Sequence, residues 1–175
     1  MVMGGVEEVT EECGIPVDCA RTVPSWLVTL DNVPTVVMFV LGAALLWLIW
    51  WPLAVAFLIY CGLSIVMFWG LICPHCHHFD TKACPCGYGA VAPKLFKRRE
   101  GSDFRAVFRQ RIGIMFPAWI VPFVAGVYQL WNDPSLYVFG LFLAFCIVGF
   151  ALIPAISKYV GCRGCEIKDQ CPWMT

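Results

Sequence analysis

The chain has 175 residues, of which 60% are hydrophobic and only 14% are charged. A soluble domain has about 25% charged residues, and a soluble fold of this small size could not remove so much apolar surface from water. The formal net charge is zero, so the composition excludes the strongly basic balance of nucleic-acid-binding proteins and predicts no nucleic-acid partner.

Residues 1–32 form the first predicted region. The N-terminus is acidic, with Glu7 and Glu8 where a secretory signal needs basic residues, so we expect this region to be retained on the side of synthesis. It can include an interfacial helix. Asp31 and Asn32 are suitable N-caps for the helix that follows, and Pro34 then falls near the first turn.

Residues 33–72 contain no charged side chain. As one helix this stretch would be about 60 Å long, twice the hydrocarbon thickness of roughly 30 Å. Its midpoint holds Trp47, Trp50 and Trp51, followed by Pro52. Tryptophan favours the membrane–water interface, and proline interrupts a helix. The stretch is therefore predicted to be a transmembrane hairpin with helices at about 34–50 and 52–72.

Residues 73–111 are polar and rich in Cys, His, Lys and Arg. Ser102 and Asp103 can cap a helix whose apolar positions, from Phe104 to Met115, recur at helical spacing. This helix is expected to be basic and interfacial, leading into the third span; an ordinary charged helix end is the alternative. The residues expected to attract anionic lipid headgroups are Lys97, Arg98, Arg99, Arg105 and Arg109.

Residues 112–159 are predicted to form the second transmembrane hairpin. Ile112 to Trp131 carries no charge, a turn follows at 132–135, and the fourth span runs from Leu136 to about Tyr159. Residues 160–175 are a tail that contains cysteines. Glycines in the spans are expected to let helices approach closely: Gly42, Gly62, Gly126, Gly140 and Gly149.

The predicted fold is thus an all-α integral membrane protein with four transmembrane helices and a small Cys/His-rich cytoplasmic cap. All twelve Lys and Arg lie on one side of this arrangement, and Asp133 is the only charge in the two opposite turns. Positive residues of short loops stay in the cytoplasm. We therefore expect a multi-pass protein of the cell (plasma) membrane with both termini and residues 73–111 cytoplasmic.

Apart from Lys158 at the end of the fourth, the predicted spans hold no Asp, Glu, Lys, Arg or His, and the thiols of Cys61 and Cys146 are expected to be packing residues. Such spans disfavour an ion pump or a proton-coupled carrier. The three histidines lie together at 75–78, so no span offers an axial ligand and no haem is expected.

Cys73, Cys76, Cys84 and Cys86 form the first cysteine cluster. Thiols in the cytosol stay reduced, so a pattern of this kind indicates metal ligands rather than disulfides. The four sulfurs suffice for a tetrahedral Zn²⁺ site. Because the second pair is Cys-x-Cys rather than Cys-x2-Cys, His77 or His78 could replace one of its members. A loop of unliganded thiols is the alternative.

Cys162, Cys165 and Cys171 form a second, incomplete cluster. Its fourth ligand could be Cys13, Cys19 or a histidine of the loop, and such a metal would join three segments into one folded cap. An iron–sulfur cluster is the competing interpretation. The cysteine spacing departs from that of bacterial ferredoxins, however, because Lys168 stands where the third ligand belongs.

These observations favour a zinc-binding membrane protein that acts as an accessory or assembly subunit of a larger membrane complex. Its expected partners are the lipid bilayer and other membrane subunits. The alternative is a membrane redox protein that uses an iron–sulfur cluster or a dithiol at the cytoplasmic face. An enzyme acting on a lipid-linked substrate, with His75, His77 or His78 as the base, is least favoured because the sequence offers no paired carboxylates.

Overall fold

The computed structural model describes residues 22–99, 101 and 103–161. These residues form helices and turns, without a strand. Four stretches are helical, long enough and apolar enough to cross a membrane: Ser25–Trp47, Trp51–His75, Phe104–Asn132 and Leu136–Tyr159. This confirms the prediction of an all-α chain with four membrane-spanning helices and indicates a multi-pass membrane protein.

Helices α1 (Ser25–Trp47) and α2 (Trp51–Leu71) pack against each other and are joined by a short turn at 48–50. Trp50 has an extended backbone and precedes α2, and Pro52 falls in the first turn of the helix. An amide N–H in that turn would have no helical acceptor, so proline fits there without loss. The predicted second helix, 52–72, is confirmed to within one residue.

The predicted start of the first helix is wrong. α1 begins at Ser25, so Asp31 and Asn32 lie inside it, and Pro34 is an internal residue. A membrane helix tolerates proline when neighbouring groups form hydrogen bonds with the backbone carbonyl that the proline leaves without a donor. Here the first turns of α1 are held by the segment after α2, residues 73–99, which we call the Cys/His segment. Asp31 is therefore an ionisable group within the helical span, contrary to the expectation above.

The third span starts with α4 (Phe104–Arg111), whose N-cap Asp103 accepts a hydrogen bond of 2.9 Å from the Arg105 amide. A 3₁₀ turn, Ile112–Met115, connects it to α5 (Pro117–Asn132). Pro117 occupies the first turn of α5, the position that proline prefers. The predicted capped helix that leads into the third span is confirmed; Ser102 lies outside the described residues.

The fourth span begins with α6 (Leu136–Cys146), where the Ser135 hydroxyl accepts a hydrogen bond from the Val138 amide. It continues through a π-helical turn at Ile147–Leu152 into α7 (Ile153–Ile156) and a second π turn, Ser157–Gly161. Pro154 has no amide N–H to donate, and wide turns of this type accommodate such a missing bond. The predicted span from Leu136 to Tyr159 is confirmed.

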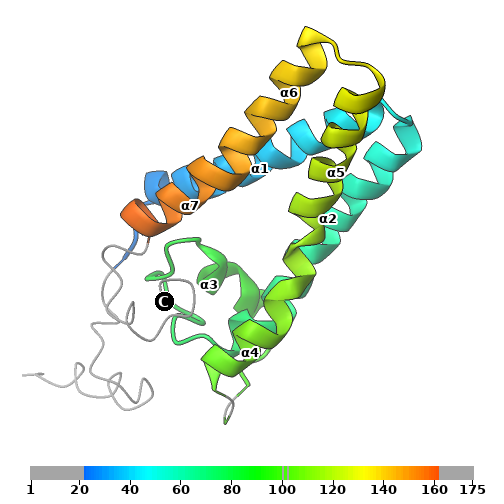
Figure 1. Cartoon of the computed structure of the whole chain (residues 1–175). Coiled ribbons are helices and arrows are strands. Elements are labelled where there is room, and N and C mark those ends of the chain that lie inside the picture. Colours follow the sequence, from blue (N-terminus) through cyan, green and yellow to red (C-terminus); the bar gives the residue numbers. More distant parts are fainter. Residues whose placement is uncertain (1–21, 100, 102, 162–175) are drawn as a thin grey trace, which may run out of the picture.

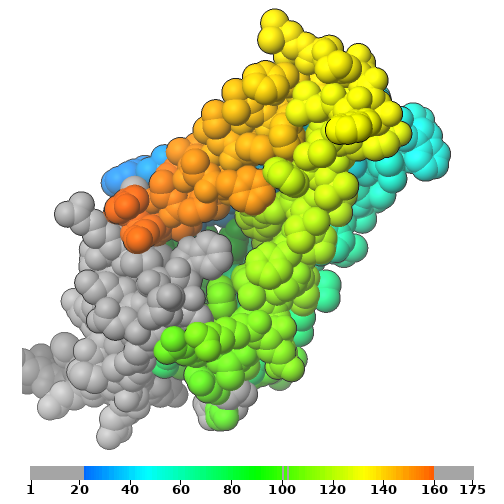
Figure 2. Space-filling model, in the orientation of Figure 1, coloured from blue at the N-terminus to red at the C-terminus, as the bar shows by residue number. Residues whose placement is uncertain are grey.

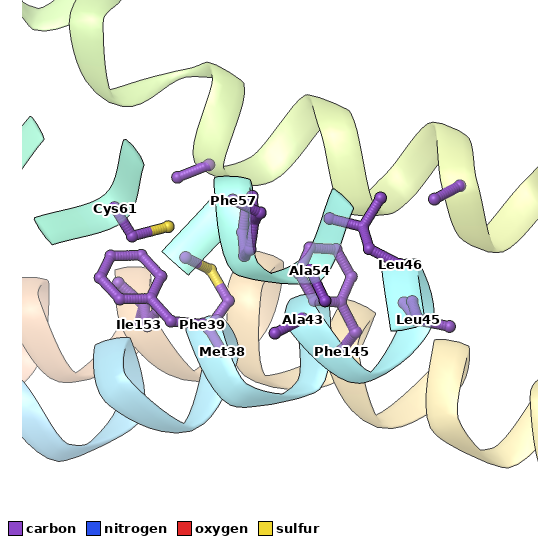
Figure 3. Packing of buried hydrophobic residues seen from close by; sticks show 12 residues of the cluster. Met38, Phe39, Ala43, Leu45, Leu46, Ala54, Phe57, Cys61, Phe145 and Ile153 are labelled. Atoms are coloured by element: carbon purple, nitrogen blue, oxygen red, sulfur yellow. The ribbon is translucent and has the colours of Figure 1, made fainter. Parts of the chain in front are cut away.

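The core lies where α1 contacts α2, α5 and α6 (Figure 3). Met38, Leu45, Cys61 and Phe145 are completely or almost completely buried there, so Cys61 is a packing residue as expected. Cys146 packs against the edge of this core.

Two of the five predicted glycines do not serve close helix contacts. A side chain at Gly42 would meet Pro122 and Phe57, and one at Gly126 would meet the Phe142 ring, so helices do approach closely there. Gly149 faces Met38. Gly62 and Gly140, in contrast, have open space around them, and the prediction is wrong for these two, because they lie on outward faces of α2 and α6.

The two ends of the bundle differ in chemistry. The turns at 48–50 and 133–135 lie at one end, and α4 and the short helix α3 (Tyr88–Val91) lie at the other (Figure 1). The turn end exposes Trp47, Trp50, Trp51 and Trp131, which are residues typical of the membrane–water interface. The α3–α4 end holds the Cys/His segment and the basic residues.

Candidate functional site

The Cys/His segment starts where α2 ends. Cys73 and His75 bound a 3₁₀ turn, Cys73–His75, that the Cys76 amide closes with a hydrogen bond of 2.9 Å to the Cys73 carbonyl. The Cys73 side chain is buried. It lies close enough to the thiols of Cys76 and Cys84 to interact with both electrostatically. Cys73 and Cys84, one from each predicted pair, are therefore within electrostatic reach of each other.

Cys84 lies in a nest of hydrogen-bond donors. Its sulfur accepts hydrogen bonds from the Cys86 thiol and from the backbone amides of Gly89, Cys86 and Tyr88. The Cys86 bond and these amides lower the pKa of Cys84 to about 6, although burial acts in the opposite direction. The thiolate is the form of cysteine that binds metals and attacks electrophiles, so the turn after Cys84 stabilises the reactive form.

Cys86 is a donor rather than a thiolate. Its hydrogen bond to Cys84, its burial and the negative charge of Asp31 raise its pKa well above the ordinary value for a thiol. Cys86 also hydrogen bonds to the Asp31 carboxylate, which in turn accepts a bond of 3.4 Å from the Ser157 hydroxyl. A chain of polar side chains thus links the Cys/His segment to α1 and to the end of the fourth span.

The first turns of α1 hold the second cysteine pair in place. The Asn32 side-chain amide donates to the Cys86 carbonyl at 3.1 Å and to the Val28 carbonyl at 2.7 Å. Gly87 has a positive φ of 75°, and a side chain there would collide with Val28. Glycine is therefore required at this turn for both its conformation and its lack of a Cβ.

Tyr88 closes the site on the side of α2. Its ring makes edge contacts with Phe68 and Trp69, at centroid distances of 6.0 and 5.7 Å. Burial and the neighbouring Cys86 thiol raise the pKa of Tyr88, so the phenol stays protonated. Sequence reasoning did not identify Asp31, Asn32 or Tyr88 as part of the site; the extended charge-free run from Val33 made Asp31 resemble a helix cap outside the span.

The histidines are placed differently from one another. His77 and His78 are half-buried in the turn after Cys76, where the His78 carbonyl accepts the hydroxyl of Thr81 at 3.0 Å. Both ring nitrogens of His75 are buried without a hydrogen-bond partner in the described part of the chain. Arg99 and Arg111 lie near that ring. The predicted role of His77 and His78 as substitute metal ligands therefore stays a prediction.

No metal-binding constellation is preformed in the described ranges. Across residues 22–99, 101 and 103–161, no three side chains of His, Cys, Asp or Glu stand so that they could hold one metal ion. The predicted ligands Cys13, Cys19, Cys162, Cys165 and Cys171 lie outside these ranges, so the second cluster stays a prediction.

The basic residues predicted to meet lipid headgroups lie at the α3–α4 end. Lys97, Arg98, Arg99 and Arg109 are exposed, and Arg105 is half-buried. The backbone amide of Arg99 donates to the Pro74 carbonyl at 3.1 Å. Arg111, the last residue of α4, donates from its guanidinium to the Leu71 carbonyl at 3.0 Å, so it closes the end of α2.

Replacing Asn32 with alanine tests the hold of α1 on the cysteine pair. Asn32→Ala removes the donor to the Cys86 carbonyl, and a hydrogen bond of this kind contributes about 0.5–1.5 kcal/mol. We expect maleimide labelling of Cys84 and Cys86 in detergent to become up to about tenfold faster. Thr29→Ala is the matched control, since the Thr29 hydroxyl donates to the Ser25 carbonyl within α1 rather than to the Cys/His segment. Equal labelling rates in both variants would show that Asn32 does not hold the pair.

The comparisons with known proteins found no matching family model, no matching curated protein and no matching solved structure. Function is therefore inferred from the chemistry of the residues described above.

Proposed function

We propose that this chain is a multi-pass protein of the cell membrane that binds Zn²⁺ through Cys73, Cys76, Cys84 and Cys86 and acts as an accessory or assembly subunit of a larger membrane complex. The observation that carries the proposal is the environment of Cys84. Its sulfur accepts three backbone hydrogen bonds and lies within electrostatic reach of Cys73. Amide donors aimed at a thiolate are the outer-shell support that cysteine metal ligands require.

Zinc binding requires the thiol side chains to turn. A tetrahedral site needs four sulfurs at about 2.3 Å from the ion, whereas Cys86 now points its thiol at Cys84 and Asp31. Rotation about single side-chain bonds moves a sulfur without moving the backbone. Zinc would displace the Cys86 proton, because only the thiolate coordinates the metal. The Asp31 carboxylate stands beside that thiol as a neighbouring base.

The proposed orientation places both termini and the Cys/His segment in the cytoplasm. It rests on the charges: Lys82, Lys94, Lys97 and other cations cluster at one end, while Asp133 is the charged residue of the opposite turns. Cytosolic thiols stay reduced and available to metals. The last described turn, Ser157–Gly161, contacts α1 through the hydrogen bond from the Ser157 hydroxyl to Asp31.

The role as a subunit rests on what the spans contain. The polar side chains of the described spans are few, and the outward faces of the four helices are apolar, which suits lipid or other transmembrane helices. Purification from the native membrane in a mild detergent tests this role. The chain is expected to elute together with other polypeptides, and elution as a single chain would contradict a subunit role.

A dithiol redox function is the second candidate, and the hydrogen bond between Cys84 and Cys86 favours it. A thiolate next to a protonated thiol is the arrangement that precedes disulfide formation. Oxidation of this thiolate–thiol pair would form one S–S bond and release two electrons and the single Cys86 proton to a cytosolic or membrane acceptor. The C-x-C spacing and the burial of Cys86 would govern how readily an oxidant reaches it.

Elemental analysis of the purified full-length protein separates these candidates. The zinc proposal predicts at least one zinc ion per chain and a colourless sample. Iron together with acid-labile sulfide and visible absorbance would contradict it and indicate an iron–sulfur cluster. Protein without metal, with a disulfide between Cys84 and Cys86 found by mass spectrometry, would contradict it in favour of dithiol chemistry.

A further inference from the structure

Residues 94–111, which we call the basic segment, contact the end of α2 near both of their own ends. Near its start, the Phe96 ring packs over Gly70, and the Arg99 amide is bonded to the Pro74 carbonyl. At its other end, the Arg111 guanidinium is bonded to the Leu71 carbonyl. Leu71 is the last residue of a membrane-spanning helix, so these contacts place the basic segment at the level where that helix leaves the hydrocarbon.

The segment carries a large excess of positive charge. Residues 94–111 contain seven Lys or Arg and two acidic residues. One of these acids, Asp103, is engaged as the N-cap of α4. Nearby, Asp31 is engaged with Cys86 and Ser157. The cations of the segment outnumber its acidic residues by five, seven against two, so the segment keeps a net positive charge that attracts anions.

Helix α4 presents this charge beside apolar rings. Phe104 and Phe108 contact each other, at a centroid distance of 5.8 Å, while Arg109 is exposed. Apolar rings next to cations are typical of helices that lie in the membrane interface. Figure 2 shows α4 at the end of the molecule opposite the turn between α5 and α6, so this surface belongs to a single leaflet.

We propose that Lys97, Arg98, Arg99 and Arg109 form a binding surface for the headgroups of anionic phospholipids. The occupant is a lipid because the surface lies where a span enters the bilayer, next to the apolar faces of α2 and α5. Arg105 is half-buried and makes other interactions, so it is not part of the surface. The proposal is independent of the zinc site.

The test measures lipid binding to the full-length protein in a neutral detergent. Short-chain phosphatidylglycerol and phosphatidylcholine are titrated separately, and bound lipid is counted by native mass spectrometry. The variant Lys97→Gln/Arg98→Gln removes two cations of the surface. Each basic residue near a membrane contributes about fivefold to binding, so the pair is expected to weaken phosphatidylglycerol binding roughly thirtyfold. Lys82→Gln/Lys158→Gln, two exposed lysines at the same end, is the matched control and is expected to bind as the unmodified protein does.

Three outcomes would overturn the proposal: equal binding of the two lipids, equal losses in the two variants, or displacement of phosphatidylglycerol by inorganic phosphate at the same concentration. The last result would indicate a site for free phosphate rather than a lipid surface. The unmodified protein provides a check that needs no variant. Raising the salt concentration from about 0.1 to about 1 M shortens the screening length from about 10 to about 3 Å, and phosphatidylglycerol binding is then expected to fall while phosphatidylcholine binding stays constant.

Discussion

Gly89→Ala is expected to disrupt the Cys/His segment. The added Cβ would meet the backbone carbonyl oxygen of His78 well inside van der Waals contact, and it would lie 2.9 Å from the Cβ of Cys84. A carbonyl that belongs to the backbone cannot rotate away as a side chain does. Crowding of this kind costs about 1–3 kcal/mol, and occasionally more. The displaced Gly89 amide would also lose its bond to the Cys84 sulfur.

Thermal unfolding and thiol labelling measure this effect. We expect Gly89→Ala to lower the unfolding midpoint in detergent. The same loss of free energy would open the segment more often, so maleimide labelling of Cys84 is expected to become tenfold faster or more. Gly62→Ala is the matched control, because nothing lies within 4 Å of that position. Within a helix, alanine is more favourable than glycine by about 1 kcal/mol, so the control is not expected to lose stability. If Gly89→Ala labels as slowly as Gly62→Ala, the close contact with His78 is not a feature of the folded protein.

Cys84→Ser is expected to abolish stoichiometric zinc binding. A serine hydroxyl stays protonated at neutral pH, so it would replace a stabilised thiolate with a poor ligand. Loss of an outer-shell partner weakens metal binding 10–100-fold, and we expect loss of this inner ligand to weaken it by more than about a hundredfold. A competition titration with a coloured zinc chelator measures the change.

Cys146→Ser is the control for this variant. Cys146 lies at the edge of the transmembrane core, far along the fourth span from the Cys/His segment, and its thiol is not a proposed ligand. The control is expected to retain the zinc affinity of the unmodified protein. Unchanged affinity in Cys84→Ser would assign the metal to other groups, and the C-terminal cysteines would then be the next ligands to replace.

The transmembrane part of the fold was predictable from sequence because lipid imposes a simple rule. A spanning segment must satisfy its own backbone hydrogen bonds and avoid charge, so charge-free runs and their Trp, Pro and Asn-Asp-Pro interruptions located α2 and the fourth span closely. Asp103 and Ser135 were readable as caps for the same local reason. The third span of the structure matches the prediction when α4, the turn at 112–115 and α5 are counted as one continuous element.

The start of α1 was not predictable from local signals. Asp31, Asn32 and Pro34 together resemble a helix start, yet the helix begins at Ser25. What overrides the local signal is a tertiary contact: Asn32 donates to a carbonyl 54 residues away in the chain. Such a bond leaves no trace in the hydrophobic pattern.

The site shows the same division. The spacing of Cys73, Cys76, Cys84 and Cys86 predicts that these thiols share one region; in the structure Cys73 interacts electrostatically with Cys76 and Cys84, and Cys84 with Cys86. The role of Asp31 depends on Cys86 and on Ser157, 126 residues further along the chain. Because α1 and the fourth span must first pack together, only the folded chain reveals this polar link.

X-ray absorption at the zinc edge, on the full-length protein loaded with one equivalent of zinc, tests the central claim most directly. Coordination by the thiols of the Cys/His segment predicts a shell dominated by sulfur at about 2.3 Å from the zinc. In Cys84→Ser this sulfur shell is expected to shrink or vanish. A shell of nitrogen and oxygen alone, at about 2.0–2.2 Å, would contradict the claim that these cysteines hold the metal.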